Sequence, residues 1–217
     1  MTESAGAPSS PIIDRLRRDV LVAVIRSTSA ESAVLAVDAL VAGGIRGIEV
    51  TYTTPGATEA IATLAHRYGD EITLGAGTIT EPWQAVDATH AGAGFLVAPG
   101  TRPALAAAMR ETGAALLLGA LTPAEVMMAV EEGADLVKLF PASLGGPDYL
   151  RSLRGPFPEV PFCPTGGVNP TTIPHWLDAG AVALGAGGEL CPSAKVAAGD
   201  WGGVTELARS FVAALSR

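Results

Sequence analysis

One pattern constrains this chain more than any other: a short apolar run, a turn, and then an amphipathic stretch rich in Ala and Leu, repeated along its length. The apolar runs cover residues 21–25, 47–52, 73–78, 95–99, 115–121, 136–141, 161–166 and 182–187. Most of them are continuously apolar rather than alternating, which is typical of strands buried on both faces of a parallel sheet. The sequence therefore predicts a parallel sheet covered by helices.

The number of strand–helix units favours one architecture. An open flavodoxin-like sheet would use only five or six units, whereas the eight runs predict a (β/α)8 TIM barrel. The protein has 217 residues, which is near the short end for that fold, so we expect residues 11–217 to form a single barrel domain. We expect residues 10–19 to form an extra N-terminal helix capping the bottom of the barrel, and residues 1–10 to be a disordered tail.

Composition excludes several classes of protein. Hydrophobic residues make up 48% and charged residues 17%, which excludes a disordered chain. A net charge of −8 without a basic run argues against nucleic acid and anionic membrane surfaces as partners. The first ten residues do not read as a signal peptide, and no apolar stretch approaches the roughly 18 residues of a membrane span. We expect a cytoplasmic protein.

The cysteines and histidines show no ligand pattern. Cys163 and Cys191 lack a CxxC or zinc spacing, so small hydrophobic side chains are the better interpretation. His66, His90 and His175 stand alone, and no pair has the spacing of metal ligands. We expect neither a metal nor a cofactor.

Two charged residues fall inside apolar strands. Lys138 lies in the run 136–141 and Glu49 in the run 47–52. A lone buried ammonium is costly unless it is paired or deprotonated, so two interpretations stay open. Lys138 and Glu49 could form a structural ion pair, or Lys138 could be an amine nucleophile that forms a Schiff base while Glu49 shuttles protons.

Glycines at three strand ends and one arginine complete the candidate site. In 75–78 the glycines would let the backbone approach a ligand, while Gly166 and Gly167 end one strand and Gly187 and Gly188 another. Glycine pairs after strands 7 and 8 of such barrels often bind phosphate through backbone N–H groups, although glycines also simply permit tight turns. Arg26, at the end of the first strand, either enters the barrel mouth or pairs with Glu49.

These segments resemble a known family. Ile-Glu-Val-Thr at 48–51, Gly-Ala-Gly-Thr at 75–78, Val-Lys-Leu-Phe-Pro-Ala at 137–142 and Pro-Thr-Gly-Gly-Val at 164–168 resemble the 2-keto-3-deoxy-6-phosphogluconate (KDPG) aldolases. That group includes the 4-hydroxy-2-oxoglutarate (KHG) aldolases. The resemblance runs from about residue 14 to residue 215.

The resemblance implies a homotrimeric class I aldolase that needs no cofactor and cleaves a 2-keto-3-deoxy acid to pyruvate and an aldehyde. It implies that Lys138 carries the Schiff base and that Glu49 shuttles protons. The residues implied to line the pyruvate pocket are Thr78, Pro99, Phe140 and Thr165.

The chain departs from the family pattern at two positions. Thr53 stands where some members carry a carboxylate-binding arginine, but Arg26 matches a variant with that arginine at the end of strand 1. Glu189 stands where several members have a phosphate-binding serine. An inward Glu189 side chain would repel phosphate and favour an unphosphorylated substrate, whereas an outward one would leave the phosphorylated substrate preferred.

Two other functions use the same barrel. A phosphosugar isomerase or epimerase would use Glu49 as a base without any covalent adduct. A non-catalytic metabolite-binding barrel would keep the glycine pairs but would not need both buried charges.

Overall fold

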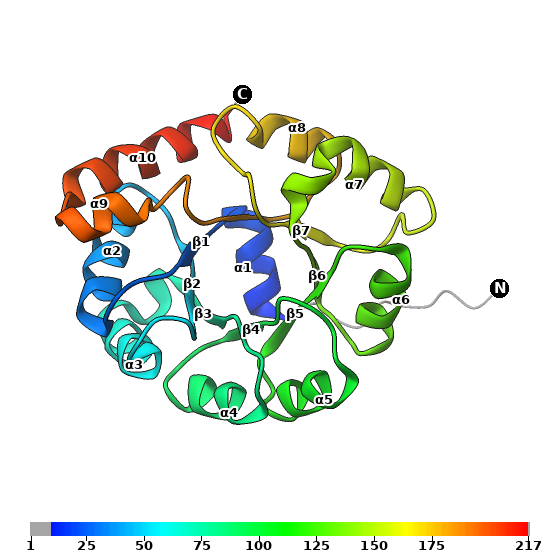
Figure 1. The fold of residues 1–217 in the computed structure, drawn as a ribbon, viewed down its shortest axis with the longest axis horizontal. Helices are drawn as coiled ribbons and strands as arrows, with labels where there is room; N and C mark the ends of the chain where they lie inside the picture. Colours follow the sequence, from blue (N-terminus) through cyan, green and yellow to red (C-terminus); the bar gives the residue numbers. More distant parts are fainter. Residues whose placement is uncertain (1–9, 217) are drawn as a thin grey trace.

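A computed structural model describes residues 10–216, in which eight parallel strands form one sheet inside a ring of helices (Figure 1). The strands are β1 (Leu21–Ile25), β2 (Gly47–Thr51), β3 (Thr73–Gly77), β4 (Phe95–Val97), β5 (Ala115–Ala120), β6 (Leu136–Leu139), β7 (Phe162–Pro164) and β8 (Leu184–Ala186). They pair in the order β7-β6-β5-β4-β3-β2-β1-β8, and an isolated bridge between Thr165 and Gly185 joins the end strands. The predicted eight-stranded barrel is confirmed, with β7 and β8 forming its seam.

The helices are α1 (Pro11–Asp19), α2 (Ala30–Ala42), α3 (Ala57–Tyr68), α4 (Pro82–His90), α5 (Pro103–Glu111), α6 (Pro123–Glu131), α7 (Gly146–Arg154), α8 (Ile173–Asp178), α9 (Ser193–Ala198) and α10 (Trp201–Ala214). Short 3-10 turns cover Gly69–Glu71 and Ala142–Leu144. Side chains cap two of the helices at their first turn: Ser29 caps α2, and Thr122 and Glu125 form a capping box on α6. Asn169-Pro170, a pair typical of a helix start, does not begin α8, because Asn169 Oδ1 accepts from the backbone N–H groups of Thr171 and Thr172 in a turn and α8 begins only at Ile173.

The apolar side chains form two cores. One lies between the sheet and the outer helices, where Ile48, Val50, Leu96 and Leu118 meet the buried faces of those helices. The other fills the barrel interior and consists of Ile13, Leu16, Val22, Phe95, Val97, Ala115, Leu117, Leu136, Cys163 and Ala183. Strands buried on both faces explain why their sequences are continuously apolar.

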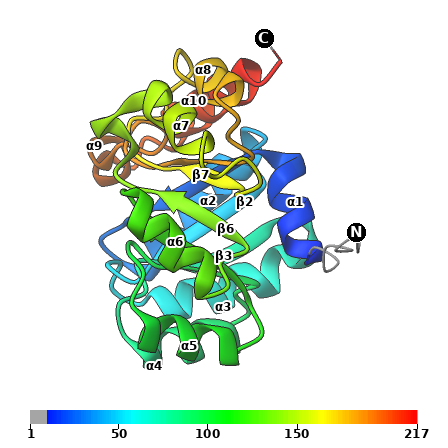
Figure 2. The same ribbon diagram turned by 90° about the vertical axis from the view of Figure 1, so that its right-hand side faces the viewer.

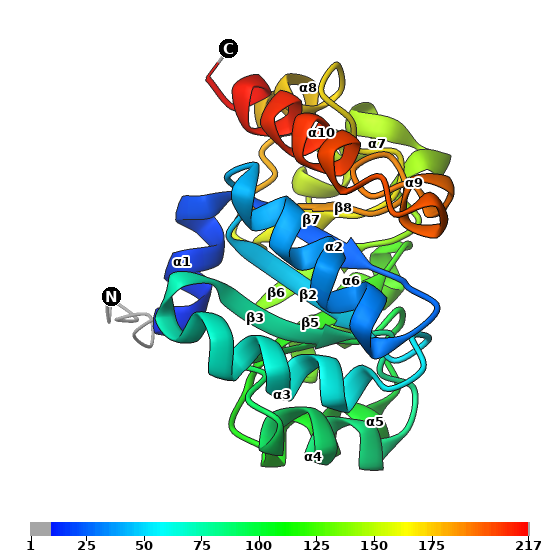
Figure 3. The same ribbon diagram turned by 90° about the vertical axis from the view of Figure 1, so that its left-hand side faces the viewer.

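Helix α1 closes one end of the barrel. Ile13 and Leu16 are its buried residues, and both belong to the interior core. Figure 1 shows α1 across the middle of the ring, and Figures 2 and 3 show it at one side of the sheet. The predicted N-terminal helix is thus present, spanning residues 11–19. Apart from Ser10, the predicted tail lies outside the described residues.

Most of the strands end before the apolar runs that predicted them. β3 ends at Gly77, β4 at Val97, and β6 at Leu139, so Thr78, Pro99 and Phe140 lie in the loops just beyond. These loops follow the carboxyl ends of the strands, where active sites of such barrels lie. Within residues 10–216, no helix is long and apolar enough to cross a membrane.

Candidate functional site

A cavity of about 290 Å³ lies at the carboxyl ends of the strands. Its lining consists of Val24, Arg26, Thr78, Pro99, Lys138, Phe140, Thr165, Gly166, Gly167, Val168, Gly187, Gly188 and Glu189. The structure thus brings together Lys138 and all the residues predicted to bind substrate. Val24 and Val168 were not predicted, although Val24 lies two residues before Arg26, and alternate residues of an extended segment point to the same side. A cavity of this size suits a small ligand.

Lys138 and Glu49 meet inside the barrel. Lys138 Nζ lies 3.6 Å from Glu49 Oε1, and the two residues are only 5% and 2% exposed. Glu49 Oε1 has no hydrogen-bond partner among the described residues. Buried polar atoms rarely lack a partner, so this oxygen has a lone pair that could accept a hydrogen bond from a group bound near Lys138. Glu49 is not part of the cavity lining, and its contact with the cavity residues is the one with Lys138.

Gly77 makes room for the Glu49 carboxylate. A Cβ atom at position 77 would lie 1.8 Å from Glu49 Oε1. Gly75 is similarly constrained, since a Cβ atom there would lie 2.4 Å from the ring of Phe95. The sequence prediction that these glycines let the backbone approach a ligand is therefore wrong, because buried side chains occupy the space beside them.

Phe140, Pro99 and Thr165 line the same cavity as the lysine. Lys138 Nζ lies 5.3 Å from the centroid of the Phe140 ring, which favours a cation at that point. A Cβ atom at Gly119, the neighbour of Lys138 on β5, would lie 2.2 Å from the Pro99 carbonyl. Thr165 is buried at the barrel seam against Gly185. The cavity that holds the amine is thus lined by one aromatic ring beside it, one proline and one threonine hydroxyl.

Cys163 is a second potential nucleophile beside the lysine. The two residues are partners in the register between β6 and β7. Burial raises the pKa of the Cys163 thiol to about 12, so the thiol stays protonated at neutral pH and is a poor nucleophile. Cys163 and Cys191 are both free, as expected for small buried or half-buried side chains.

Arg26 has a different partner from the one considered above. Its Nε donates to Thr53 Oγ1 at 3.0 Å, while the ion-pair partner of Glu49 is Lys138. Among the described residues no carboxylate pairs with Arg26. The alternative that Arg26 serves Glu49 is wrong, and the guanidinium is available to a ligand in the cavity.

The loops after β7 and β8 present unused backbone donors. The N–H groups of Gly167, Gly188 and Glu189 have no backbone or side-chain acceptor in the loops of residues 10–216, whereas Gly166 lies next to the bridge between Thr165 and Gly185. Gly166 and Gly167 have φ values of +102° and +75°, which favour glycine. Successive N–H groups in such conformations form a concavity that suits an anion.

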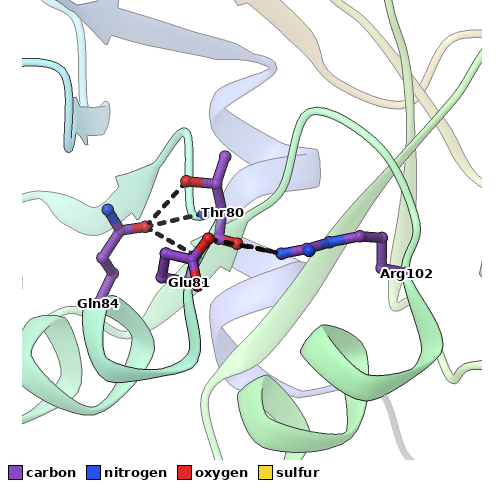
Figure 4. A network of polar contacts seen from close by, with 4 residues as sticks. All are labelled: Thr80, Glu81, Gln84 and Arg102. Atoms are coloured by element: carbon purple, nitrogen blue, oxygen red, sulfur yellow. Dashed lines mark hydrogen bonds and ion pairs between the residues drawn. The ribbon is translucent and has the colours of Figure 1, made fainter.

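A polar network joins two loops at the rim (Figure 4). Gln84 Oε1 accepts from the Thr80 and Glu81 backbone N–H groups at 2.8 and 3.1 Å. Arg102, on the next loop, donates to the Thr80 carbonyl and lies 4.0 Å from Glu81. The network ties the loops that carry Thr78 and Pro99. Thr78 has a φ of +56°, a strained conformation for a β-branched residue, and such strain is concentrated at functional sites.

Comparison with known proteins identifies the family. The family model described as KDPG and KHG aldolase matches residues 12–207. The chain is 39% identical to the 2-dehydro-3-deoxy-phosphogluconate aldolase of Pseudoalteromonas atlantica, over 89% of this chain and 90% of that protein. It is also 39% identical to the KHG/KDPG aldolase of Escherichia coli K12, over 88% of this chain and 90% of that protein.

Solved structures agree with this assignment. The KDPG aldolase of Legionella pneumophila, with pyruvate captured at low pH as a covalent carbinolamine, superposes with a TM-score of 0.85 at 32% identity. That match covers 93% of this chain and 98% of the other. The KDPG aldolase of Zymomonas mobilis gives a TM-score of 0.82 at 34% identity, over 93% and 96% of the two chains. By family model, sequence and fold, the chain belongs to the KDPG and KHG aldolase family.

Proposed function

We propose that this protein is a class I aldolase that cleaves 2-dehydro-3-deoxy-6-phosphogluconate to pyruvate and glyceraldehyde 3-phosphate, a carbon–carbon lyase reaction. The observation that carries the proposal is the buried Lys138–Glu49 pair at the cavity. A carbinolamine of pyruvate, as in the Legionella pneumophila enzyme, is the adduct of an amine with the keto carbon. Lys138 supplies such an amine here.

The first stage forms the iminium. Glu49 accepts a proton from the Lys138 ammonium, the free amine attacks the C2 carbonyl of the keto acid, and a proton passes from the nitrogen to the C2 oxygen to give a carbinolamine. Glu49 returns its proton to the leaving hydroxyl, which departs as water. The 3.6 Å separation between amine and carboxylate and the unpartnered Glu49 Oε1 support this role.

The second stage breaks the carbon–carbon bond. Glu49 removes the C4 hydroxyl proton, the aldehyde forms as the C3–C4 bond breaks, and the electron pair passes into the iminium to give an enamine. Glu49 then returns the proton to the terminal carbon of the enamine, and water hydrolyses the resulting iminium to pyruvate and free Lys138. The iminium is the only electron sink that these reaction steps use.

The cavity lining fits the pyruvate half of the substrate. Arg26 lies at the cavity without a carboxylate partner, which supports a role in binding the substrate carboxylate. Thr78 and Thr165 offer hydroxyl groups to polar oxygens. Pro99 and Phe140 offer apolar surface to the pyruvate carbons.

The loops after β7 and β8 fit the phosphate. The unused N–H groups of Gly167 and Gly188, together with the cavity-lining loops at Gly166 and Gly187, support binding of a dianion in the same cavity as the lysine. Glu189 lies at the cavity and is exposed. We expect its side chain to turn toward water, because this avoids the cost of desolvating a carboxylate. The unphosphorylated substrate 4-hydroxy-2-oxoglutarate is the alternative if it turns inward.

We also propose a homotrimer in the cytoplasm. The family resemblance supports the trimer, as do the exposed apolar side chains of Trp83 on α4 and of Met127 and Val130 on α6. Light scattering coupled to gel filtration measures the mass, and a monomer at working concentration would contradict the trimer.

Product analysis tests the proposed reaction. Incubation with the phosphorylated keto acid should release equimolar pyruvate and glyceraldehyde 3-phosphate, measured by NMR. An isomerase or epimerase would leave the carbon skeleton intact, and a binding protein would leave the substrate unchanged. Either of these results would contradict the aldolase assignment.

A further inference from the structure

We infer that Thr53 is a positioning residue that holds the Arg26 guanidinium in the orientation that binds the substrate carboxylate. The inference rests on the proposed function, which assigns Arg26 to that carboxylate. Thr53 does not line the cavity, so it acts through Arg26 alone. The observation behind it is a chain of hydrogen bonds from Arg26 through Thr53 and Thr51 to the backbone of β1.

The donors in this chain follow from the number of protons. Thr51 Oγ1 lies 2.9 Å from the Ile25 carbonyl oxygen, which can only accept, so the Thr51 hydroxyl proton is used there. Thr51 Oγ1 and Thr53 Oγ1 lie 2.8 Å apart, and Thr53 must therefore be the donor of that bond. The Thr53 oxygen is left with lone pairs only, and it accepts from Arg26 Nε at 3.0 Å. Every hydroxyl in the chain thus has one fixed direction.

The buried end of this series of hydrogen bonds, at Thr51, is fixed in the sheet. Thr51 is fully buried at the end of β2, and its acceptor Ile25 is the last residue of β1. A second hydrogen bond joins the loops that follow β1 and β2, since the Ser27 N–H donates to Thr54 Oγ1 at 3.0 Å. The anchor for Arg26 is therefore part of the barrel rather than a mobile side chain.

The bond to Thr53 selects one edge of the guanidinium for the ligand. With Nε–H engaged, the edge formed by Nε and one Nη is blocked, and the two Nη groups remain as the fork for a carboxylate. Arg26 is otherwise exposed, and an exposed arginine has many rotamers to lose on binding. Fixing it beforehand lowers the entropic cost of capturing the substrate.

The test compares variants of Thr53 by the pyruvate concentration that gives half-maximal borohydride trapping, together with KM and kcat for cleavage. Thr53→Val keeps the shape but removes both bonds, and Thr53→Ser keeps the hydroxyl. We expect the valine variant to raise the half-saturating pyruvate concentration and KM about tenfold, with kcat within about twofold of wild type. The serine variant should behave as wild type.

Two controls isolate the role of Thr53. Thr58→Val removes a threonine hydroxyl that bonds the Tyr52 hydroxyl at 3.0 Å instead of Arg26, and it should change neither constant. In an Arg26→Met background, Thr53→Val should cause no further change, because the two residues act as one unit.

Wild-type constants in Thr53→Val, or the same tenfold effect in the Arg26→Met background, would overturn the inference while leaving the aldolase assignment intact. Absence of any trapping by the wild-type protein would instead overturn the proposed function, and the inference with it.

Discussion

Gly77→Ala offers a steric test of the position of Glu49. The added Cβ would lie 1.8, 2.4 and 2.5 Å from Glu49 Oε1, Cδ and Cγ, whereas ordinary contacts begin at 3.4 Å. All three atoms belong to the end of one flexible side chain, so the strand can stay in place while the carboxylate moves. The carboxylate must retreat by roughly 1 Å or more, and a misplacement of that size costs about 10²-fold in rate.

The expected effect is therefore larger on catalysis than on folding. Overpacking costs about 1–3 kcal/mol, which leaves the protein folded if its stability is ordinary. Thermal unfolding followed by circular dichroism measures this loss, and pyruvate release from the phosphorylated keto acid measures kcat. Gly100→Ala is a matched control, because a Cβ atom there meets nothing within 4 Å. A folded Gly77→Ala protein with the wild-type kcat would refute the claim that Glu49 must lie beside Lys138.

Three further predictions follow from single side chains. Glu49→Gln keeps the shape of the side chain but cannot shuttle protons, so exchange of the pyruvate methyl protons with deuterated water, followed by NMR, should slow roughly 10²–10⁴-fold; a wild-type exchange rate would assign the base elsewhere. Glu189→Ser should change kcat/KM for the phosphorylated substrate by less than about tenfold, and a much larger gain confined to that substrate would mean that Glu189 excludes phosphate. Hydrogen bonds from the Thr122 and Leu121 backbone N–H groups lower the pKa of Glu125 in the folded protein. The ionised carboxylate therefore stabilises the fold at pH values above the pKa of Glu125 in the unfolded chain, and this stabilisation is lost as the pH falls through the lowered pKa of the folded protein. Denaturant unfolding should accordingly find Glu125→Gln less stable than wild type at pH 7, with a difference that shrinks below about pH 4; a constant difference would contradict this.

The barrel could be predicted from the sequence because burial on both faces leaves a continuous apolar run at each strand. The ends of the strands could not, since the loop residues that line the cavity are also apolar or small. Pro99 and Phe140, for example, extend two apolar runs past the last strand residue. Asn169 illustrates a similar ambiguity, because an Asn side chain can cap a turn, as it does here, as well as a helix.

The sequence predicted the site residues where a charged residue interrupts an apolar strand. Lys138 and Glu49 stand out as charges within buried strands. A buried charge needs an opposite charge to offset the cost of its desolvation, so the sequence predicts that the two residues pair. The roles of Gly75 and Gly77 were not predictable, because they depend on which side chains of neighbouring strands occupy the space beside them. The bond between Arg26 and Thr53 also needs the register of β1 against β2.

The most direct test of the central claim is to trap the covalent intermediate. The protein is incubated with pyruvate and borohydride, and peptide mass spectrometry then locates the added mass. The account predicts one reduced adduct per chain, on Lys138, and neither adduct nor cleavage in Lys138→Arg, which keeps the charge but cannot form an imine. An adduct on Lys195, the other lysine of the chain, or activity retained in the arginine variant, would contradict it.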